Sequence, residues 1–372
     1  MSTIANKLAR EELVDMVPYQ SARRLYASGS DSSAEAQNKI WLNANEAPGA
    51  GKYNINSSSI NRYPDFQPDN LIGAYCAYSG LTPANILATR GADEGIELII
   101  RTFCKAYQDS ILICPPTYGM YAISAENHGA NIVRVPLINN QLDLDNMTTQ
   151  VGQVKVVFLC SPGNPTGNLL TTESIKAVLD LFGDTAIVVV DEAYIEFSPE
   201  NTKASWIKDY PQLVVLRTLS KAFALAGLRC GFTLANPDII TMLSKVIAPY
   251  PISAPVADIA SAALAKSALE QVSIRVQETV ILRAQLFDWL TNQNWCAKVF
   301  KSDANFILFQ TTDTTTKDFI FDCLKQKDIL IRDQSAQLQL ANCLRISIGN
   351  EQELSLLKQT ITNAFSQATS ET

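Results

Sequence analysis

Several short runs of apolar residues, rich in Val, Ile and Leu, constrain the fold of this 372-residue chain more than any other feature. The runs do not alternate between apolar and polar positions, as a strand with one solvent face would. Strands buried on both faces have this pattern, and they occur in parallel sheets between two layers of helices. The sequence therefore predicts an α/β fold with a mostly parallel sheet. The predicted strands are ILIC (111–114), NIVRVPL (131–137), VKVVFLC (154–160), AIVVVDEA (186–193), LVVLRTL (213–219) and GFTLA (231–235).

The composition changes near residue 250 and predicts a second, smaller α/β domain. The segment APYPISAP holds three prolines, which favour a hinge over a helix or a central strand. An alanine-rich helical segment follows, then the strand-like runs NFILFQ, ILIRD and CLRISIG and a terminal helix. The predicted division is an N-terminal arm (1–45) that packs on the small domain, a large domain (46–255) and a small domain (256–372). The arm is expected to hold a short amphipathic helix and a polar linker at 27–38.

Composition and charge exclude several classes of function. The formal net charge is −7, whereas a nucleic-acid-binding protein needs a basic face. No apolar stretch approaches the ~20 residues of a membrane span, and the N-terminus lacks the apolar core of a secretory signal. The eight cysteines are scattered without metal-ligand spacing, which favours reduced thiols, no metal and a cytoplasmic location. His128 is the only histidine, and it is interpreted as an exposed loop residue rather than as a catalytic base.

Polar side chains follow three of the predicted strands directly. SPGNPTG follows the strand at 154–160, Tyr194 follows the strand at 186–193, and Ser220 and Lys221 follow the strand at 213–219. Because ligands of open α/β sheets bind outside the carboxyl ends of the strands, these groups are expected to meet in one crevice.

Lys221 and Asp191 are the most informative of these residues. A lysine between apolar runs is poorly placed for a surface role, and burial favours the neutral amine that forms imines with aldehydes. Asp191 ends an apolar strand, so its carboxylate needs a cationic partner, and a pyridinium nitrogen is one. The alternatives are a lysine that extends to solvent from a strand end and a structural ion pair or helix cap at Asp191.

Groups that suit a phosphate lie near these two residues. Gly91, Ala92 and Asp93 open a helix directly after a strand, where free backbone N–H groups can receive an anion. SPGNPTG is no nucleotide-binding P-loop, because no Gly-Lys-Ser/Thr follows. An ordinary strand-to-helix connection remains the alternative at both places. Hydroxyls and a guanidinium near Lys221 are supplied by Thr218, Ser220 and Arg229.

In this order along the chain, Asn164, Asp191 with Tyr194, Ser220-Lys221 and Arg229 closely resemble the fold-type I aminotransferases that depend on pyridoxal phosphate (PLP). Further segments make the chain similar to the histidinol-phosphate aminotransferase family, class II of that fold, from about Pro18 to beyond Gly349. These segments are LNANEAP, NRYPD, RGADEGIELIIR, CPPTYGMY, SPGNPTG, DEAYIEF, RTLSKAFALAGLRCGF, PYP and LRISIG.

The resemblance implies a role for each matching residue. Lys221 would hold PLP as a Schiff base and act as general base, and Asp191 would pair with the ring nitrogen. Asn164 and Tyr194 would bind the ring's 3-oxygen, and Tyr118 would stack on the ring. The cofactor phosphate would be held by the backbone of Ala92 and Asp93 and by Thr218, Ser220, Arg229 and Tyr63.

The resemblance also implies partners and substrates. Tyr63 would come from the neighbouring subunit of a homodimer. The anionic groups of L-histidinol phosphate and 2-oxoglutarate would be bound by Arg345, with Arg332 and Tyr19 at the phosphate. The products would be imidazole acetol phosphate and L-glutamate, in histidine biosynthesis.

Other functions of the same fold remain open at this point. They are an aromatic or broad-specificity aminotransferase, a threonine-phosphate decarboxylase and, more remotely, a PLP-fold transcriptional regulator, which would need an extra basic N-terminal domain. Ala47 stands where close relatives often carry an aromatic residue, and Gly163 stands where many carry asparagine. These departures concern the substrate pocket and leave the predicted reaction class unchanged.

Overall fold

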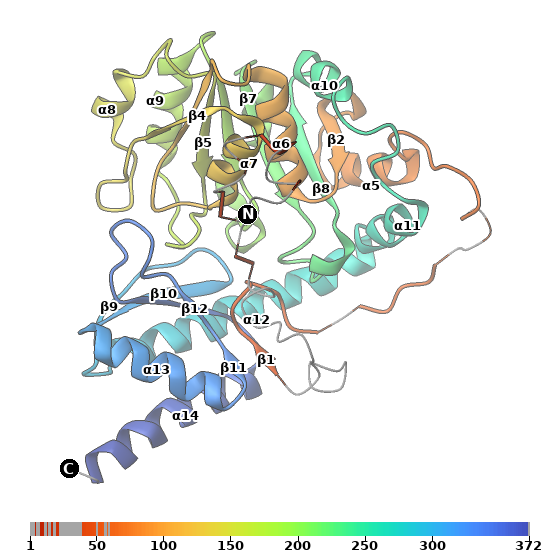
Figure 1. Ribbon diagram of the computed structural model, residues 1–372. Helices are drawn as coiled ribbons and strands as arrows, with labels where there is room; N and C mark the ends of the chain where they lie inside the picture. The colour runs from red at the N-terminus through yellow and green to blue at the C-terminus, as the bar shows by residue number, and fades with distance from the viewer. Residues whose placement is uncertain are drawn as a thin grey trace.

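The computed structural model describes residues 4, 8–10, 13, 16–17, 20–21, 39–49, 51–55, 58 and 60–370. Tyr19 and the predicted linker at 27–38 lie outside the described residues, and the predicted N-terminal helix lies mostly outside them. The rest forms a large α/β part around one sheet and a smaller part below it in Figure 1.

A seven-stranded sheet with the strand order β2-β8-β7-β6-β5-β3-β4 lies at the centre of the large part. All its pairs are parallel except those of β8, which runs antiparallel to both neighbours. The prediction of a mostly parallel sheet is therefore confirmed. The strands are β2 (Ile86–Thr89), β3 (Ser110–Ile113), β4 (Asn131–Arg134), β5 (Val156–Cys160), β6 (Ile187–Asp191), β7 (Leu213–Thr218) and β8 (Gly231–Ala235).

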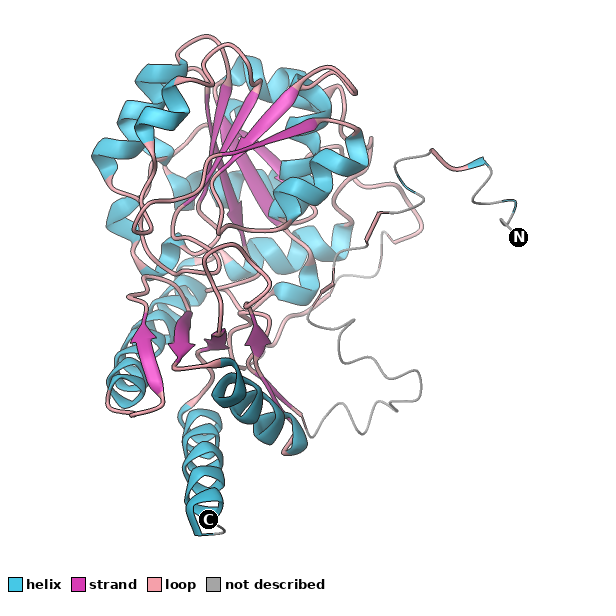
Figure 2. Ribbon diagram, turned by 60° about the vertical axis from the view of Figure 1, so that its left-hand side comes forward, coloured by secondary structure: helices cyan, strands magenta, loops and turns pink. Residues whose placement is uncertain are grey.

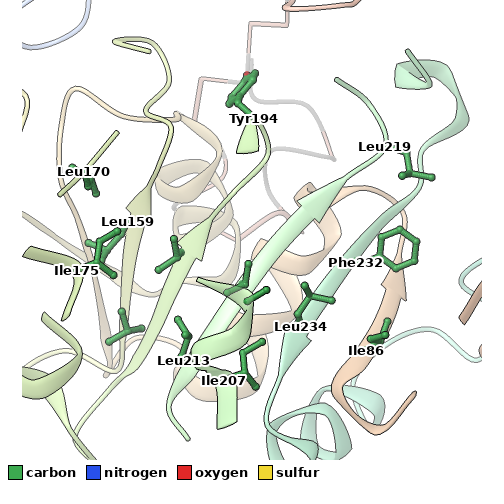
Figure 3. Packing of buried hydrophobic residues seen from close by; sticks show 14 of the residues in the cluster. Ile86, Leu159, Leu170, Ile175, Tyr194, Ile207, Leu213, Leu219, Phe232 and Leu234 are labelled. Carbon is green, nitrogen blue, oxygen red and sulfur yellow. The ribbon is translucent and has the colours of Figure 1, made fainter. Parts of the chain in front are cut away.

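Helices cover both faces of this sheet, as the continuously apolar strands require. One face packs against α6 (Ala92–Phe103), α7 (Met120–His128) and α10 (Pro237–Ser244). The other face packs against α5 (Asp69–Ser79), α8 (Leu144–Thr148), α9 (Thr172–Phe182) and α11 (Ala254–Ala263). Figure 3 shows part of this second layer, with Leu159, Leu213 and Leu234 on strands β5, β7 and β8.

The smaller part has its own sheet (Figure 2). It also has its own apolar core. Its antiparallel sheet has the order β12-β13-β10-β9, and β1 pairs with β11 in a separate parallel ladder. The strands are β1 (Ile40–Trp41), β9 (Cys296–Val299), β10 (Phe306–Thr311), β11 (Ile329–Leu330), β12 (Arg332–Asp333) and β13 (Cys343–Ser347). The helices are α12 (Lys266–Thr291), α13 (Thr314–Gln326) and α14 (Glu351–Ser370).

Short 3₁₀ turns complete the large part: η1 (Pro83–Asn85), η2 (Ile195–Phe197), η3 (Pro199–Asn201), η4 (Ala204–Lys208) and η5 (Ala226–Leu228). The segment after residue 250 enters α11, which packs on α5, and then α12, which reaches the small sheet. The domain boundaries at residues 45 and 255 stay predictions. Among the described residues, no helix combines the length and the apolar character that crossing a membrane requires.

The interpretation of His128 as an exposed loop residue is wrong. His128 is the last residue of α7, it is partly buried, and its Nε2 lies 2.8 Å from the carbonyl oxygen of Cys104. The helix ends directly after His128, because the next residue, Gly129, adopts the left-handed conformation with φ 88° and caps the helix.

Candidate active site

A cavity of about 480 Å³ opens where the strands that carry the predicted site residues end. Almost all predicted site residues line it, as expected for ligand binding at the carboxyl ends of parallel strands. These residues are Ala92, Asp93, Tyr118, Asn164, Asp191, Tyr194, Thr218, Ser220, Lys221, Arg229, Arg332 and Arg345. Tyr63 is not among the residues that line the cavity; its side chain is 81% exposed and its ring stacks on that of Tyr250 at 4.4 Å.

Asp191 is the last residue of β6, and its side chain is only 3% exposed. One carboxylate oxygen, Oδ2, accepts a hydrogen bond of 2.6 Å from the hydroxyl of Tyr121, and Oδ1 accepts one of 3.1 Å from the backbone N–H of Ala193. Burial raises the pKa of Asp191 to about 6, although both hydrogen bonds act to lower it. No cationic side chain of the described residues forms an ion pair with this carboxylate.

Lys221 lies three residues beyond the end of β7, and its Nζ donates a 3.1 Å hydrogen bond to the carbonyl oxygen of Ala44. The same nitrogen lies 5.6 Å from the ring centroid of Tyr194. Burial and, to a smaller degree, the charge of Arg345 lower the pKa of Lys221 to about 8. About one tenth of the amine is therefore neutral at pH 7, far more than for an exposed lysine.

Hydrogen-bond donors gather at the first turn of α6, where the N-cap residue Gly91 provides no side-chain cap. Arg229 extends over this turn, with Nη2 3.1 Å from Oδ2 of Asp93 and Nη1 3.3 Å from Oγ of Ser220. Oγ of Ser220 in turn lies 2.9 Å from Oγ1 of Thr218. Free helix N–H groups, hydroxyls and a guanidinium at one place form a site for a phosphate-sized anion.

Gly91 is required at this turn for two reasons. Its backbone has a φ of +81°, a value that residues other than glycine rarely adopt. A Cβ atom at this position would also lie 2.7 Å from Nη2 of Arg229. Glycine therefore lets the arginine approach the end of the helix closely.

Asn164, Tyr194 and Arg345 form one hydrogen-bonded group on the other side of the cavity. Nη1 of Arg345 donates to Oδ1 of Asn164 at 2.6 Å, and Nδ2 of Asn164 donates to the hydroxyl of Tyr194 at 3.3 Å. Arg345 is 7% exposed and comes from β13 of the small part, so the cavity wall is shared between both parts of the chain. Arg332, on β12, donates through Nη2 to the backbone oxygen of Gln20 at 2.7 Å.

Several residues of the site were missed by the sequence prediction. Asn45 donates to the Tyr194 hydroxyl at 2.9 Å and accepts, through its backbone oxygen, a 3.0 Å hydrogen bond from Asn305. Tyr121 binds Asp191 as described, and its place three residues after Tyr118, in the segment CPPTYGMY, was a signal that could have identified it. The cavity is also lined by Asn43, Ala44, Glu46, Thr117, Cys160, Gln334 and Gln337.

A buried ion-pair network lies next to the ends of β6 and β7. Arg217 on β7 lies 2.8 Å from Glu192 and 3.1 Å from Glu196, and it donates to Oγ1 of Thr202 at 2.9 Å. Because Glu192 is the residue after Asp191, the network ties the ends of β6 and β7 together. Asp191 and Lys221 therefore follow strand ends that this network holds in place.

Comparisons with known proteins agree with this arrangement. The family model described as aminotransferase class I and II matches residues 34–361. A protein of Colwellia psychrerythraea named histidinol-phosphate aminotransferase is 61% identical over 95% of this chain and 98% of its own length. A protein of Yersinia enterocolitica with the same name is 51% identical over 95% of this chain and 91% of its own length.

Solved structures show the same fold. The histidinol-phosphate aminotransferase of Sinorhizobium meliloti, in complex with pyridoxal-5′-phosphate, aligns with a TM-score of 0.84 over 99% of this chain and 100% of that one, at 24% identity. The histidinol-phosphate aminotransferase of Clostridium acetobutylicum aligns with a TM-score of 0.76 over 83% and 92%, at 26% identity. The predicted fold and the predicted family resemblance are therefore confirmed, and the chain belongs to the aminotransferase class I and II family.

Proposed function

We propose that this protein is a PLP-dependent transaminase that converts L-histidinol phosphate and 2-oxoglutarate to imidazole acetol phosphate and L-glutamate, in histidine biosynthesis. The observation that carries the proposal is the 61% identity to the Colwellia protein of that name, across nearly the full length of both chains. The PLP in the Sinorhizobium structure supports the choice of cofactor.

The cavity fits PLP at three separate points. Asp191 offers a buried carboxylate that has no cationic partner among the described residues, which suits a protonated ring nitrogen. Lys221 offers an amine whose lowered pKa suits bonding to an aldehyde carbon. The first turn of α6 with Arg229 offers donors for a phosphate. When bound, PLP supplies a ring that withdraws electrons from the substrate's Cα.

The proposed roles follow from these positions. Lys221 would hold the aldehyde carbon of PLP as a Schiff base and, once the substrate amine has taken its place on that carbon, would move the proton between the substrate Cα and the cofactor C4′. Asp191 keeps the ring nitrogen protonated. Asn164 and Tyr194, already hydrogen-bonded to each other, bind the ring's 3-oxygen. Tyr118, whose hydroxyl is held at 3.0 Å by Asp93, stacks on the ring face.

The phosphate is bound by the backbone N–H groups of Ala92 and Asp93 together with Thr218, Ser220 and Arg229. Tyr63 completes the phosphate site from the second subunit of a homodimer. The 81% exposure of its side chain in one chain supports this part of the proposal, because a large aromatic ring gains most from burial in an interface.

Arg345 binds the carboxylate of 2-oxoglutarate and the anionic end of the donor in turn. Arg332 and Tyr19 contribute to binding the phosphate of L-histidinol phosphate. Because both substrates are anions, one cationic pocket serves both half-reactions. Arg332 and Arg345 both line the cavity, which supports this assignment. The division into an arm, a large domain and a small domain, with the cleft between the last two, belongs to the same proposal.

A cytoplasmic location is also part of the proposal. All eight cysteines are free, and none forms a disulfide. Disulfides are rare in reducing compartments, so free thiols at these positions support a reducing environment.

The lowered pKa of the Lys221 amine predicts how the rate of PLP incorporation depends on pH. Burial lowers its pKa from the ordinary 10.5 to about 8, so the reactive neutral amine becomes dominant above about pH 8. The rate of covalent PLP incorporation into the apoprotein is expected to rise about tenfold per pH unit below that value and to level off above it. Stopped-flow absorbance after mixing apoprotein with PLP measures this rate. A rate that keeps rising to about pH 10 would contradict the lowered pKa.

A steady-state assay of the purified protein tests the substrate. We expect kcat/KM for L-histidinol phosphate to exceed that for aromatic amino acids by about 10- to 100-fold, the worth of charged hydrogen bonds to a phosphate. A preference for aromatic amino acids would overturn the substrate assignment and leave transamination intact. Release of CO₂ from threonine phosphate without glutamate formation would overturn the reaction itself.

A further inference from the structure

We propose that Tyr121 is a positioning residue for the cofactor: its hydroxyl fixes the Asp191 carboxylate in the charged form and the orientation that bind the ring nitrogen. The inference rests on the proposed binding of PLP and concerns a residue that the sequence prediction did not single out.

The contact between the two side chains is short and buried. The Tyr121 side chain is 0% exposed, and its hydroxyl donates to Oδ2 of Asp191 at 2.6 Å, within the range of charge-assisted O–H···O⁻ hydrogen bonds. Burial raises the pKa of Tyr121 well above its ordinary value, so the hydroxyl keeps its proton and acts as a donor. Oδ2 of Asp191 therefore accepts a hydrogen bond from a hydroxyl whose position is fixed.

The tyrosine ring is itself held rigidly. It stacks on the ring of Phe158 with centroids 4.7 Å apart, and its edge meets the ring of Tyr118 at 5.7 Å in a T-shaped pair. Tyr118 is the residue proposed to cover the cofactor ring. Tyr121 thus contacts both the residue that would pair with the ring nitrogen, Asp191, and the residue that would stack on the ring face, Tyr118.

Asp191 needs this hydrogen bond because the groups around it disfavour its charge. Burial raises its pKa to about 6, and the negative charges of Asp93 and Glu192 act in the same direction. The thiol of Cys160 interacts with the Tyr121 hydroxyl, and burial raises the pKa of Cys160 to about 12, so it stays a neutral thiol. Tyr121 and the backbone N–H of Ala193 are the groups that lower the pKa of Asp191. Loss of the Tyr121 hydroxyl therefore shifts the carboxyl towards its neutral form.

The test compares two cofactors on the full-length apoprotein. The dissociation constants of PLP and of 1-deaza-PLP, in which a carbon replaces the ring nitrogen, are measured by fluorescence titration. For Tyr121→Phe, which keeps the ring and its packing, we expect PLP to bind about tenfold more weakly and 1-deaza-PLP to bind as it does to the unchanged protein. The selectivity arises because only PLP has a nitrogen for Asp191 to bind.

Tyr75→Phe is the matched control, because Tyr75 is likewise buried, at 1% exposed, and stacked on a phenylalanine, yet it does not line the cavity. It is expected to leave both dissociation constants unchanged. Asp191→Asn provides the second measurement: adding Tyr121→Phe to it is expected to cause no further loss of PLP affinity.

The outcomes separate this inference from the proposed function. If Tyr121→Phe weakens the binding of PLP and of 1-deaza-PLP equally, or weakens the binding of neither, the proposed role of Tyr121 is wrong. The proposed function is unaffected by that result. A further loss in the Asp191→Asn background overturns the role of Tyr121 as well. Failure of the unchanged apoprotein to bind PLP overturns the proposed function.

Discussion

Replacement of Lys221 by alanine is expected to lower the kcat of transamination by about 10²- to 10⁴-fold, the usual contribution of a positioned general base. The substitution removes the amine that we propose to bond to PLP and to carry the proton between the substrate Cα and the cofactor C4′. Steady-state formation of glutamate from 2-oxoglutarate at saturating substrates measures the loss. Borohydride reduction followed by mass spectrometry of the peptide containing residue 221 shows whether PLP is still attached to the chain.

Two further variants distinguish the chemistry of the amine from its charge and its burial. Lys221→Arg keeps a positive charge that does not dissociate near neutral pH, so it is expected to be as inactive as the alanine variant. Lys203→Met removes another buried lysine whose pKa burial lowers, but Lys203 binds Thr172 and the backbone oxygen of Asn201 instead of lining the cavity. It is expected to retain activity once folded. Turnover near normal in Lys221→Ala would refute the assignment of the base.

The parts of the site that the sequence predicted correctly lie at the ends of strands. The apolar runs predicted the ends of β5, β6 and β7 to within two residues, and parallel neighbours end at the same edge. The sequence therefore predicts that Asn164, Asp191 and Lys221 meet, and all three line one cavity. This follows from the continuous apolar runs, which can be recognised in a single sequence.

The residues that the sequence missed reach the cavity through long-range contacts instead. Asn45 is held by Ser347 at 2.8 Å and by Asn305 at 3.0 Å, residues about 300 and 260 positions away along the chain. No local pattern records such a contact, because it depends on how the small sheet sits against the large part. The predicted strand at 131–137 also proved too long: β4 ends at Arg134, shortly before Pro136, which has no N–H to donate to a neighbour.

The roles of Tyr63 and Tyr19 stay predictions for a different reason. Tyr63 is expected to act in the cavity of a neighbouring subunit, whereas the structure holds a single chain, in which Tyr63 is exposed. Tyr19 lies outside the described residues.

Replacement of Arg345 by alanine is expected to weaken both substrates together. The guanidinium is 7% exposed at the cavity wall, so the anionic group it binds would lose its partner in a largely desolvated place. Removal of one partner of such a pair costs about 2–5 kcal/mol, or roughly 30- to 5,000-fold in kcat/KM. Steady-state kinetics with L-histidinol phosphate and with 2-oxoglutarate, each varied at a fixed level of the other, measure the two losses separately.

Arg345→Lys is the informative companion, because it keeps the charge and loses the planar fork. We expect it to recover only part of the affinity, since two parallel hydrogen bonds to a carboxylate need the guanidinium. Arg345 also donates to Asn164 at 2.6 Å and to the backbone oxygen of Asn43 at 3.1 Å, so the dissociation constant of PLP must be measured for each variant. Loss of PLP affinity would mean that the arginine acts through Asn164. If only the amino donor suffers, the two substrates do not share this arginine, and the single cationic pocket is wrong.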